Sequence, residues 1–313
     1  MKAPKLALVL PCYNEEEVID SSYSKLATLF NDLTTKSIID VDSKLIFIDD
    51  GSKDKTWDKI ESFIGQPFAK GIKLSRNFGH QYAVLAGLES QVNQFDIYIS
   101  IDADLQDDIN TIEEMVNHFQ NGSKVVYGVR NDRSSDSFFK RKTAEGFYKL
   151  MSKLGVESIH NHADYRLIDN DVLHSFLRFN EQNLFLRGIF PKIGYPSSIV
   201  YYQRKEREAG VSKYPFGKML SFAWDGVSSF SVRPLRMILH LGLITFFISL
   251  IMLIWAFIAF FRGTVIPGWF SIIIPITIFG GIQMISIGII GEYVGKIYTE
   301  TKSRPRFIIE KEV

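Results

Sequence analysis

Two carboxylates one residue apart stand out in the stretch YISIDADLQDD, residues 98–108. Asp102 and Asp104 follow an apolar run, and Gln106 adds a neutral side-chain oxygen two residues later. Oxygen ligands in this arrangement suit a hard divalent cation such as Mg²⁺ or Mn²⁺, which commonly binds one or two carboxylates together with phosphate oxygens. We therefore expect Asp102, Asp104 and Gln106 to form a metal site at the end of a strand.

The other two carboxylates of this stretch have a different interpretation. Asp107 and Asp108 directly precede a helical pattern over Ile109–Gln120. Negative charge is favourable at a helix N-terminus, where unpaired backbone N–H groups and the helix dipole are positive. We expect this pair to cap that helix.

Short apolar runs alternate with stretches of helical spacing over residues 1 to about 215. The expected strands are Leu6–Leu10, Leu45–Ile48, Ile72–Leu74, Ile97–Ile101 and Val125–Val129. The expected helices are Glu15–Leu33, Thr56–Ile64, His80–Gln91 and Ile109–Gln120. This alternation predicts an open α/β domain with a parallel sheet and helices on both of its faces.

Polar clusters follow all five expected strands. They are PCYNEE at 11–16, DDGS at 49–52, SRNFGHQ at 75–81, DADLQ at 102–106 and RNDR at 130–133. Ligands of open α/β sheets bind beyond the carboxyl ends of the strands, so these clusters predict a binding site at one edge. The chain contains neither Gly-x-x-x-x-Gly-Lys-Ser/Thr nor Gly-x-Gly-x-x-Gly, which argues against a P-loop ATPase and a standard dinucleotide-binding dehydrogenase.

Composition narrows the classes of partner and compartment. The 313 residues carry a formal net charge of +1, so the overall charge does not indicate a nucleic-acid partner. The one cysteine, Cys12, excludes an intramolecular disulfide and fits a reducing compartment. The scattered histidines, His80 among them, are not expected to bind metal.

Two long apolar segments follow the α/β pattern. Leu235–Phe261 and Trp269–Ile290 each reach the roughly 20 residues that a membrane-spanning helix needs. Arg262–Gly268 is short enough to join them as a hairpin. Lys and Arg lie mainly before the first segment and after the second, so the positive-inside rule places both chain ends in the cytoplasm.

The sequence is thereby divided into four parts. They are a cytosolic domain over 1–213, an interfacial segment over 214–234, a two-span hairpin over 235–290 and a cytosolic tail over 291–313. Tyr214–Val232 mixes aromatic and polar residues, which fits an amphipathic helix on the membrane surface as well as a packed linker helix. We expect a protein of the inner, or plasma, membrane, and the hairpin leaves self-association open.

Six motifs occur in a recognisable order along the chain. They are PCYNEE, IDDGSKDKT, LSRNFGHQYAVLAGL, DADLQD, ADYRLID and REAGVSKY. Together they resemble glycosyltransferase family 2, and more narrowly its polyprenyl-phosphate branch, the bactoprenol glucosyltransferases and dolichol-phosphate mannose synthases. The resemblance covers residues 6 to about 220. It implies a GT-A fold, a Rossmann-like α/β domain that binds a nucleotide sugar.

The resemblance also implies roles for particular residues. Those matching donor-binding positions are Pro11, Tyr13, Asn14, Glu15, Asp50, Asp102 and Gln106. Asp104 shares the metal and diphosphate site, where a cation would neutralise the departing diphosphate. Asp164, in ADYRLID, matches a catalytic carboxylate that acts as a base or as an orienting group. The alternative for Asp164 is an ordinary ion pair with Arg166.

The implied acceptor is a polyprenyl phosphate such as undecaprenyl phosphate. A phosphate monoester has a second pKa of about 6, so it needs placement and charge neutralisation more than deprotonation. Arginine suits this task through bidentate hydrogen bonding. The basic residues near matching family positions are Arg130, Arg141, Arg207 and Lys213.

The resulting hypothesis is an inverting, metal-dependent transfer of one hexose at the cytoplasmic membrane face. UDP-glucose is the favoured donor, and GDP-mannose stays open. One rival is a processive polysaccharide synthase, but its Gln-x-x-Arg-Trp element is missing from the sequence. The other is a non-catalytic membrane scaffold with a degenerate transferase domain, against which the intact Asp102, Asp104 and Asp164 argue.

Overall fold

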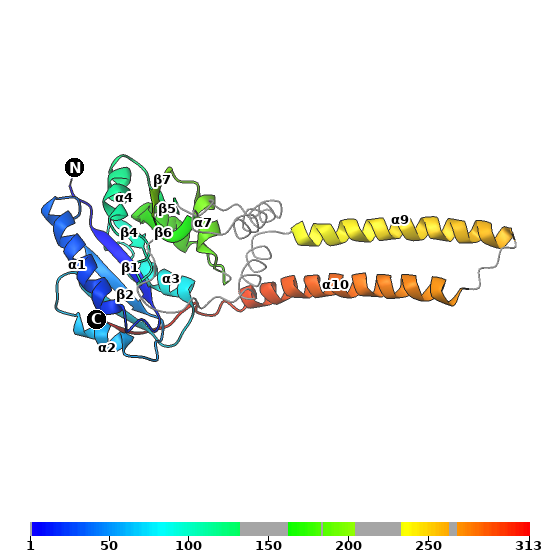
Figure 1. The fold of residues 1–313 in the computed structure, drawn as a ribbon, viewed down its shortest axis with the longest axis horizontal. Helices are drawn as coiled ribbons and strands as arrows, with labels where there is room; N and C mark the ends of the chain where they lie inside the picture. The colour runs from blue at the N-terminus through cyan, green and yellow to red at the C-terminus, as the bar shows by residue number, and fades with distance from the viewer. Residues whose placement is uncertain (1, 132–161, 183, 204–232, 263–267) are drawn as a thin grey trace. The chain divides into compact units, whose positions relative to one another are not determined.

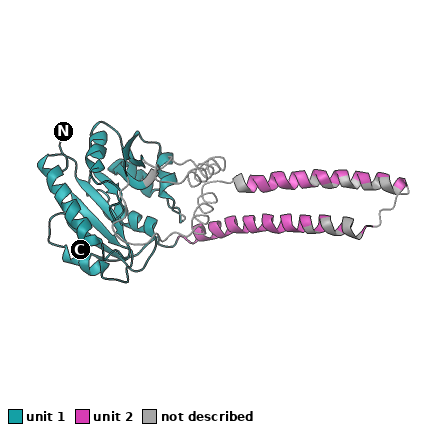
Figure 2. Cartoon of the chain, viewed as in Figure 1, with its two compact units in different colours: residues 1–149, 157–215, 304–313 teal, residues 150–156, 216–303 magenta. Residues whose placement is uncertain are grey.

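The chain divides into two compact units. A computed structural model describes residues 2–131, 162–182, 184–203, 233–262 and 268–313 (Figure 1). The first unit comprises residues 1–149, 157–215 and 304–313, and the second comprises 150–156 and 216–303 (Figure 2). The sheet belongs to the first unit, and two long helices belong to the second.

An eight-stranded mixed sheet forms the centre of the first unit. Its strands are β1 (Leu6–Cys12), β2 (Lys44–Asp49), β3 (Ala69–Leu74), β4 (Ile97–Ser100), β5 (Val125–Arg130), β6 (His162–Asp169), β7 (Ser197–Tyr202) and β8 (Ile309–Glu312). Their order is β7-β5-β6-β4-β1-β2-β3-β8. All five expected strands are present and point the same way. The sheet is not purely parallel, however, because β6 and β8 run antiparallel to their neighbours.

Helices cover both faces of this sheet (Figure 1). They are α1 (Ile19–Thr35), α2 (Thr56–Ser62), α3 (His80–Ser90), α4 (Thr111–Gln120), α6 (Asn170–Leu177) and α7 (Leu186–Ile193). Alternate residues of β1 face opposite ways: Leu8 and Leu10 join a core with residues of α1, α2 and α4. On the other face α3 packs tightly, since a Cβ on Gly87 would lie 2.6 Å from a Val9 methyl group.

The expected capping of α4 by Asp107 and Asp108 is wrong. The helix begins at Thr111, and its N-cap residue Asn110 makes no side-chain capping bond. Asp108 instead accepts a hydrogen bond from the backbone N–H of Asn110 (3.3 Å) in the preceding turn. Asp107 is buried, and its carboxylate accepts a hydrogen bond from the hydroxyl of Tyr202 at 2.7 Å.

The last ten residues of the chain, 304–313, return to the first unit. Strand β8 pairs antiparallel with β3 and forms an edge of the sheet. Lys70 and Lys73 of β3 make ion pairs with Glu312 (2.9 Å) and Glu310 (3.1 Å). The segment that follows the apolar helices thus contains a strand that the sequence pattern did not reveal.

The second unit contains α9 (Arg233–Phe261) and α10 (Trp269–Thr301). Both agree with the two expected apolar segments, although α10 continues past Ile290. Within the described residues, one stretch is long and apolar enough to cross a membrane, Ile278–Thr301, with a mean hydropathy of 1.4. Of the expected interfacial segment, 214–234, residues 214–232 lie outside the described part of the chain, and residues 233–234 begin α9.

Candidate active site

The loops that follow β1 and β2 are tied together at the carboxyl edge of the sheet. Asn14 has a positive φ of 54°, an uncommon conformation that asparagine adopts more readily than most residues. Its side-chain oxygen accepts a hydrogen bond from the N–H of Lys53 (2.9 Å), and its own N–H donates to Ser52 Oγ (3.0 Å). Asn14 therefore holds the loop with Tyr13 and Glu15, which follows Pro11 and the end of β1, against the DDGS loop.

Asp50 fastens the DDGS loop to the next loop of the same edge. Its two carboxylate oxygens accept hydrogen bonds from the N–H groups of Phe78 (2.7 Å) and Gly79 (2.9 Å). Burial raises the pKa of this carboxyl group, while the two N–H groups oppose that rise. Asp50 thus organises the start of α3, and its expected contact with a nucleotide stays a prediction.

Asp102, Asp104 and Gln106 lie on one tight turn directly after β4. Leu105 adopts a left-handed conformation with φ 48°, and its N–H donates to the carbonyl of Asp102 (3.1 Å). The N–H of Gln106 donates to the Asp104 carboxylate at 3.3 Å. The pKa of Asp102 is raised, first by burial and then by the negative charges of Asp164 and other nearby carboxylates.

The chemistry of this turn fits a divalent cation that shares its coordination with a substrate. Two carboxylates and an amide carbonyl are oxygen ligands, and a cation would offset their mutual repulsion. Across the described ranges, no group of three or more His, Cys, Asp and Glu side chains is arranged to hold a metal. With two carboxylates and one amide oxygen, this turn would need phosphate oxygens of a substrate to complete the coordination of Mg²⁺ or Mn²⁺.

Strand pairing brings Asp164 to the same edge. Because β6 runs antiparallel to β4, the first residues of β6 lie beside the last residues of β4, and Arg166 pairs in register with Ser100. The hydroxyl of Ser100 donates to the carbonyl of Asp164 at 2.5 Å. His80, the first residue of α3, places Nε2 3.7 Å from carboxylate oxygens of both Asp102 and Asp164. Asp164 and the turn after β4 therefore belong to one site.

Two arginines hold the Asp164 carboxylate. Arg166 donates from Nη2 at 2.6 Å, and Arg187 of α7 donates from Nη2 (2.9 Å) and Nε (3.2 Å) to the two oxygens. Burial favours the neutral acid, yet Arg187 and Arg166 hold the pKa of Asp164 well below its usual range. A carboxylate with such a low pKa is a weak proton acceptor. The arrangement favours an orienting role for Asp164 over that of a general base.

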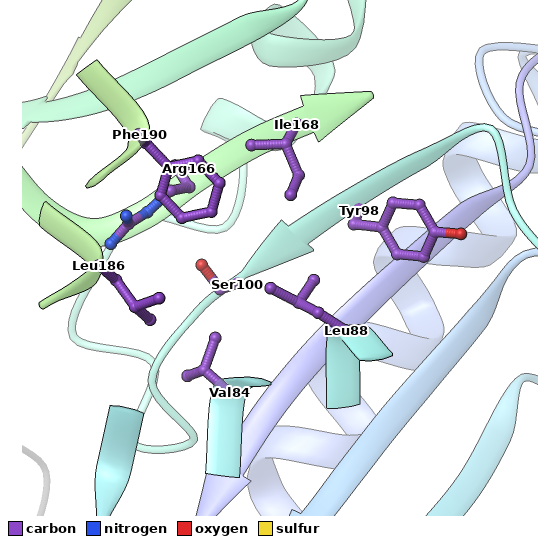
Figure 3. A pocket seen from close by; sticks show the side chains of 8 residues that line it. All are labelled: Val84, Leu88, Tyr98, Ser100, Arg166, Ile168, Leu186 and Phe190. Carbon is purple, nitrogen blue, oxygen red and sulfur yellow. The ribbon is translucent and has the colours of Figure 1, made fainter. Parts of the chain in front are cut away.

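A small cavity lies beside the Arg166 side chain (Figure 3). Its lining comes from β4, β6, α3 and α7 and includes Ser100, Arg166, Leu186 and Phe190. The Arg166 guanidinium lies over the Phe190 ring, 4.8 Å from its centroid. With about 10 Å³ of room the cavity holds at most one water molecule, so it is not a sugar or nucleotide site.

Comparison with known proteins agrees with this geometry. The model of Glycosyl transferase family 2 matches residues 7–177, and that of the GtrB C-terminal hairpin matches residues 233–297. An uncharacterized glycosyltransferase, YkoT of Bacillus subtilis, is 50% identical and aligns over 98% of this chain and 91% of its own length. The bactoprenol glucosyl transferase of Shigella phage SfX is 39% identical over 98% of this chain and 99% of its own. This chain belongs to glycosyltransferase family 2.

Among solved structures, one match is S. aureus TarS 1-349 in complex with UDP-GlcNAc. It aligns with a TM-score of 0.47 and 15% identity, covering 72% of this family 2 glycosyltransferase and 66% of the TarS chain. The GT-A-like fold expected from the motifs is confirmed by the family match and the mixed α/β sheet. The hairpin match and Ile278–Thr301 associate this glycosyltransferase with a membrane.

The predicted acceptor-phosphate residues are described only in part. Arg141, Arg207 and Lys213 lie outside the described residues. Arg130, at the end of β5, donates from Nη2 to the buried Asp107 (3.2 Å) and from Nε to the Tyr202 hydroxyl (3.2 Å). Arg130 therefore has a structural partner, and its contact with the acceptor stays a prediction.

Sequence reasoning assigned no role in the site to His80 and did not consider Arg187. His80 lies in SRNFGHQ, one of the polar clusters expected at this edge, so its position there was predicted although its contact with Asp102 and Asp164 was not. Arg187 is the second residue of α7, LRGIFPKI, far along the chain from the five strand-end clusters. Only its ion pair with Asp164 in the folded protein connects it with the site.

Proposed function

We propose that this family 2 glycosyltransferase transfers a hexose, with glucose favoured, from a nucleotide diphosphate sugar to a polyprenyl phosphate. The observation that carries the proposal is the Asp164 carboxylate, fixed by two arginines beside the turn of Asp102 and Asp104. The relatives named bactoprenol glucosyl transferase support the choice of acceptor and sugar. UDP-glucose is the favoured donor on this basis.

The chemistry of the acceptor matches the properties of Asp164. An oxygen of the acceptor phosphate forms a bond to the anomeric carbon of the sugar while the bond from that carbon to the donor diphosphate breaks. The electron pair of the broken bond leaves with the nucleoside diphosphate, and attack from the opposite face inverts the configuration. No proton has to leave an ionised phosphate, so the site needs groups that orient the acceptor rather than a strong base.

The donor would lie across the loops at the carboxyl edge of the sheet. We assign Pro11, Tyr13, Asn14 and Glu15 to the nucleoside end, because Asn14 fixes this loop and Tyr13 is 37% exposed beside it. Asp102, Asp104 and Gln106 would hold Mg²⁺ or Mn²⁺ near the diphosphate. Such a cation supplies Lewis-acid neutralisation of the leaving group.

The membrane arrangement follows from connectivity and charge. We propose a multi-pass protein whose catalytic domain and both termini are cytoplasmic. Residues 304–313 belong to the same compact unit as the N-terminal sheet, so the apolar helices between them are expected to cross the membrane an even number of times. The Lys and Arg residues that flank the hairpin support the cytoplasmic side.

The proposal is tested with the purified full-length protein, undecaprenyl phosphate and a panel of nucleotide sugars. We expect one lipid-linked hexose per acceptor and release of a nucleoside diphosphate, with undecaprenol inactive as an acceptor. Products with several sugars would favour a processive synthase. Nucleotide binding without turnover for every common donor would contradict the proposal and favour a non-catalytic scaffold.

A further inference from the structure

We propose that Arg187 binds a substrate phosphate group in this site. The inference rests on the proposed function, since it assumes substrates that carry phosphate. Arg187 lies in the first turn of α7, outside the strand-end clusters from which the site was expected. It enters the site through its ion pair with Asp164.

The charged side chains around Asp164 become more exposed from the core to the surface. The side chain of Arg166 is 2% exposed, that of Asp164 is 16% exposed, and that of Arg187 is 46% exposed. Arg166 is buried and contacts Asp164 from within the fold, whereas Arg187 is the more exposed of the two arginines and can be reached from solvent.

Asp164 fixes the orientation of the Arg187 guanidinium. Its two oxygens accept from Nε and Nη2, which is a bidentate contact that sets the plane of the guanidinium. A guanidinium fixed in this way loses less conformational freedom when it donates further hydrogen bonds to a phosphate. Asp164 is thus a positioning residue for Arg187. The low pKa of Asp164 keeps it ionised for this contact.

The backbone near Arg187 is hydrogen-bonded to the first turn of α3, which contains His80. The N–H of Leu186 donates to the side chain of Gln81 at 2.8 Å, and the Tyr82 hydroxyl donates to the carbonyl of Gln182. Gln81 and Tyr82 directly follow His80, which lies 3.7 Å from both Asp102 and Asp164. The start of α7 is therefore held in a defined place beside the expected diphosphate and acceptor.

Two substrates could supply the phosphate that Arg187 binds, the donor diphosphate and the lipid phosphate. Both present anionic phosphate oxygens of the kind that arginine recognises. They are distinguished by measuring binding without turnover. UDP tests the donor, and a comparison of undecaprenyl phosphate with undecaprenol isolates the contribution of the lipid phosphate.

The experiment uses the full-length protein in lipid nanodiscs and compares Arg187→Ala, Arg187→Lys and Lys192→Ala. Lys192→Ala is the matched control because it removes a cation from the same helix. Arg187→Ala loses a hydrogen bond to a charged group. If the donor supplies the phosphate, we expect this variant to bind UDP about tenfold or more weakly. If the lipid supplies it, we expect an equal loss of the preference for undecaprenyl phosphate over undecaprenol. Arg187→Lys keeps the positive charge but loses the bidentate geometry of the guanidinium, so we expect a smaller loss of binding. Lys192→Ala is expected to stay within about twofold of wild type.

The inference is overturned if Arg187→Lys and any folded Arg187→Ala bind UDP and undecaprenyl phosphate like the control while turnover falls. Arg187 would then only position Asp164, and adding Arg187→Ala to Asp164→Asn would lower turnover no further. Failure of the proposed function is seen separately, as wild-type protein that forms no lipid-linked sugar. A folding defect in Arg187→Ala, detected by thermal unfolding, leaves Arg187→Lys to decide.

Discussion

Ser100 of β4 lies opposite Arg166 of β6, and this register places Asp164 beside the residues that follow β4. A shift of one residue would turn the side chains of β6 to the opposite face of the sheet. The pairing therefore decides whether Asp164 lies in the site at all. The hydrogen bond from the Ser100 hydroxyl to the Asp164 carbonyl reinforces this register.

We expect the pH dependence of turnover to follow the ionisation of the acceptor phosphate and not that of Asp164. Arg187 and Arg166, acting against burial, hold the pKa of Asp164 below its unfolded value of about 3.9. The stability from this ionised group is thus complete above that pH and is lost only as the pH falls further, through the folded pKa. Turnover should instead fall below about pH 6, where the acceptor phosphate gains its proton.

This prediction is checked by kcat/KM profiles for wild-type protein and Asp164→Asn. Both should lose activity at the same acidic pH, although the variant is slower throughout. An acidic limb that disappears or moves in Asp164→Asn would identify Asp164 as a titrating base.

Gly51 is expected to tolerate substitution poorly because its backbone lies against the backbone of Arg76 and Asn77. Its φ is 65°, and a Cβ would lie 2.6 Å from the backbone nitrogen of Asn77. Gly65 also has a positive φ, of 89°, but nothing lies within 4 Å of its Cβ position. We expect Gly65→Ala to cost about 1 kcal/mol from its conformation alone and Gly51→Ala about 3 kcal/mol. Thermal unfolding of the two variants measures the difference, and equal losses would contradict the close approach.

Asp104→Ala is expected to abolish most metal-dependent turnover while leaving the fold intact. Removal of one of two carboxylate ligands should lower kcat by about two orders of magnitude. Mn²⁺ binding in the presence of UDP, followed by electron paramagnetic resonance, should weaken in parallel. Asp108→Ala is the matched control, because Asp108 belongs to the same acidic stretch but bonds Asn110. Unchanged Mn²⁺ binding in Asp104→Ala would refute the metal assignment.

Arg306 is expected to matter more for stability than other charged residues of the C-terminal segment. Its side chain is 12% exposed, and it donates to the Phe179 carbonyl (3.0 Å) and pairs with Glu89 (3.3 Å). Arg306→Ala should lower the free energy of unfolding by about 2 kcal/mol. Lys311 forms a half-exposed pair with Glu61, so Lys311→Ala should cost under about 1 kcal/mol. Equal shifts in thermal unfolding would show that the Arg306 contacts contribute little.

The sequence predicted the parts of the fold that depend on local pattern. The apolar runs of β1 to β5 are regular enough to be found, and their parallel order puts the loops of Asn14, Asp50 and Asp102 at one edge of the sheet, as expected. Strand β6 has a charged residue, Arg166, at a buried position. Asp164 and Phe190 both contact its guanidinium. The ion pair with Asp164, two residues away, was weighed from the sequence, but no local pattern indicates the contact with Phe190 of α7.

The residues that were missed depend on contacts across long stretches of chain. Arg187 reaches Asp164 only once α7 has packed near β6, and β8 pairs with a strand more than 200 residues earlier. Asp107 resembles a helix cap in the sequence, yet the hydroxyl of Tyr202 and Arg130 draw it inward. In each case a distant partner outweighs the local preference.

Strand β8 also sets an order of events during synthesis. A ribosome makes the other sheet strands and both apolar helices before it makes β8. Until then the edge of β3 lacks the partner that it has in the finished protein, and unpaired strand edges favour association with other chains. The nascent protein is therefore expected to complete its catalytic domain only after its anchor has been made, which links maturation of the enzyme to delivery at the membrane.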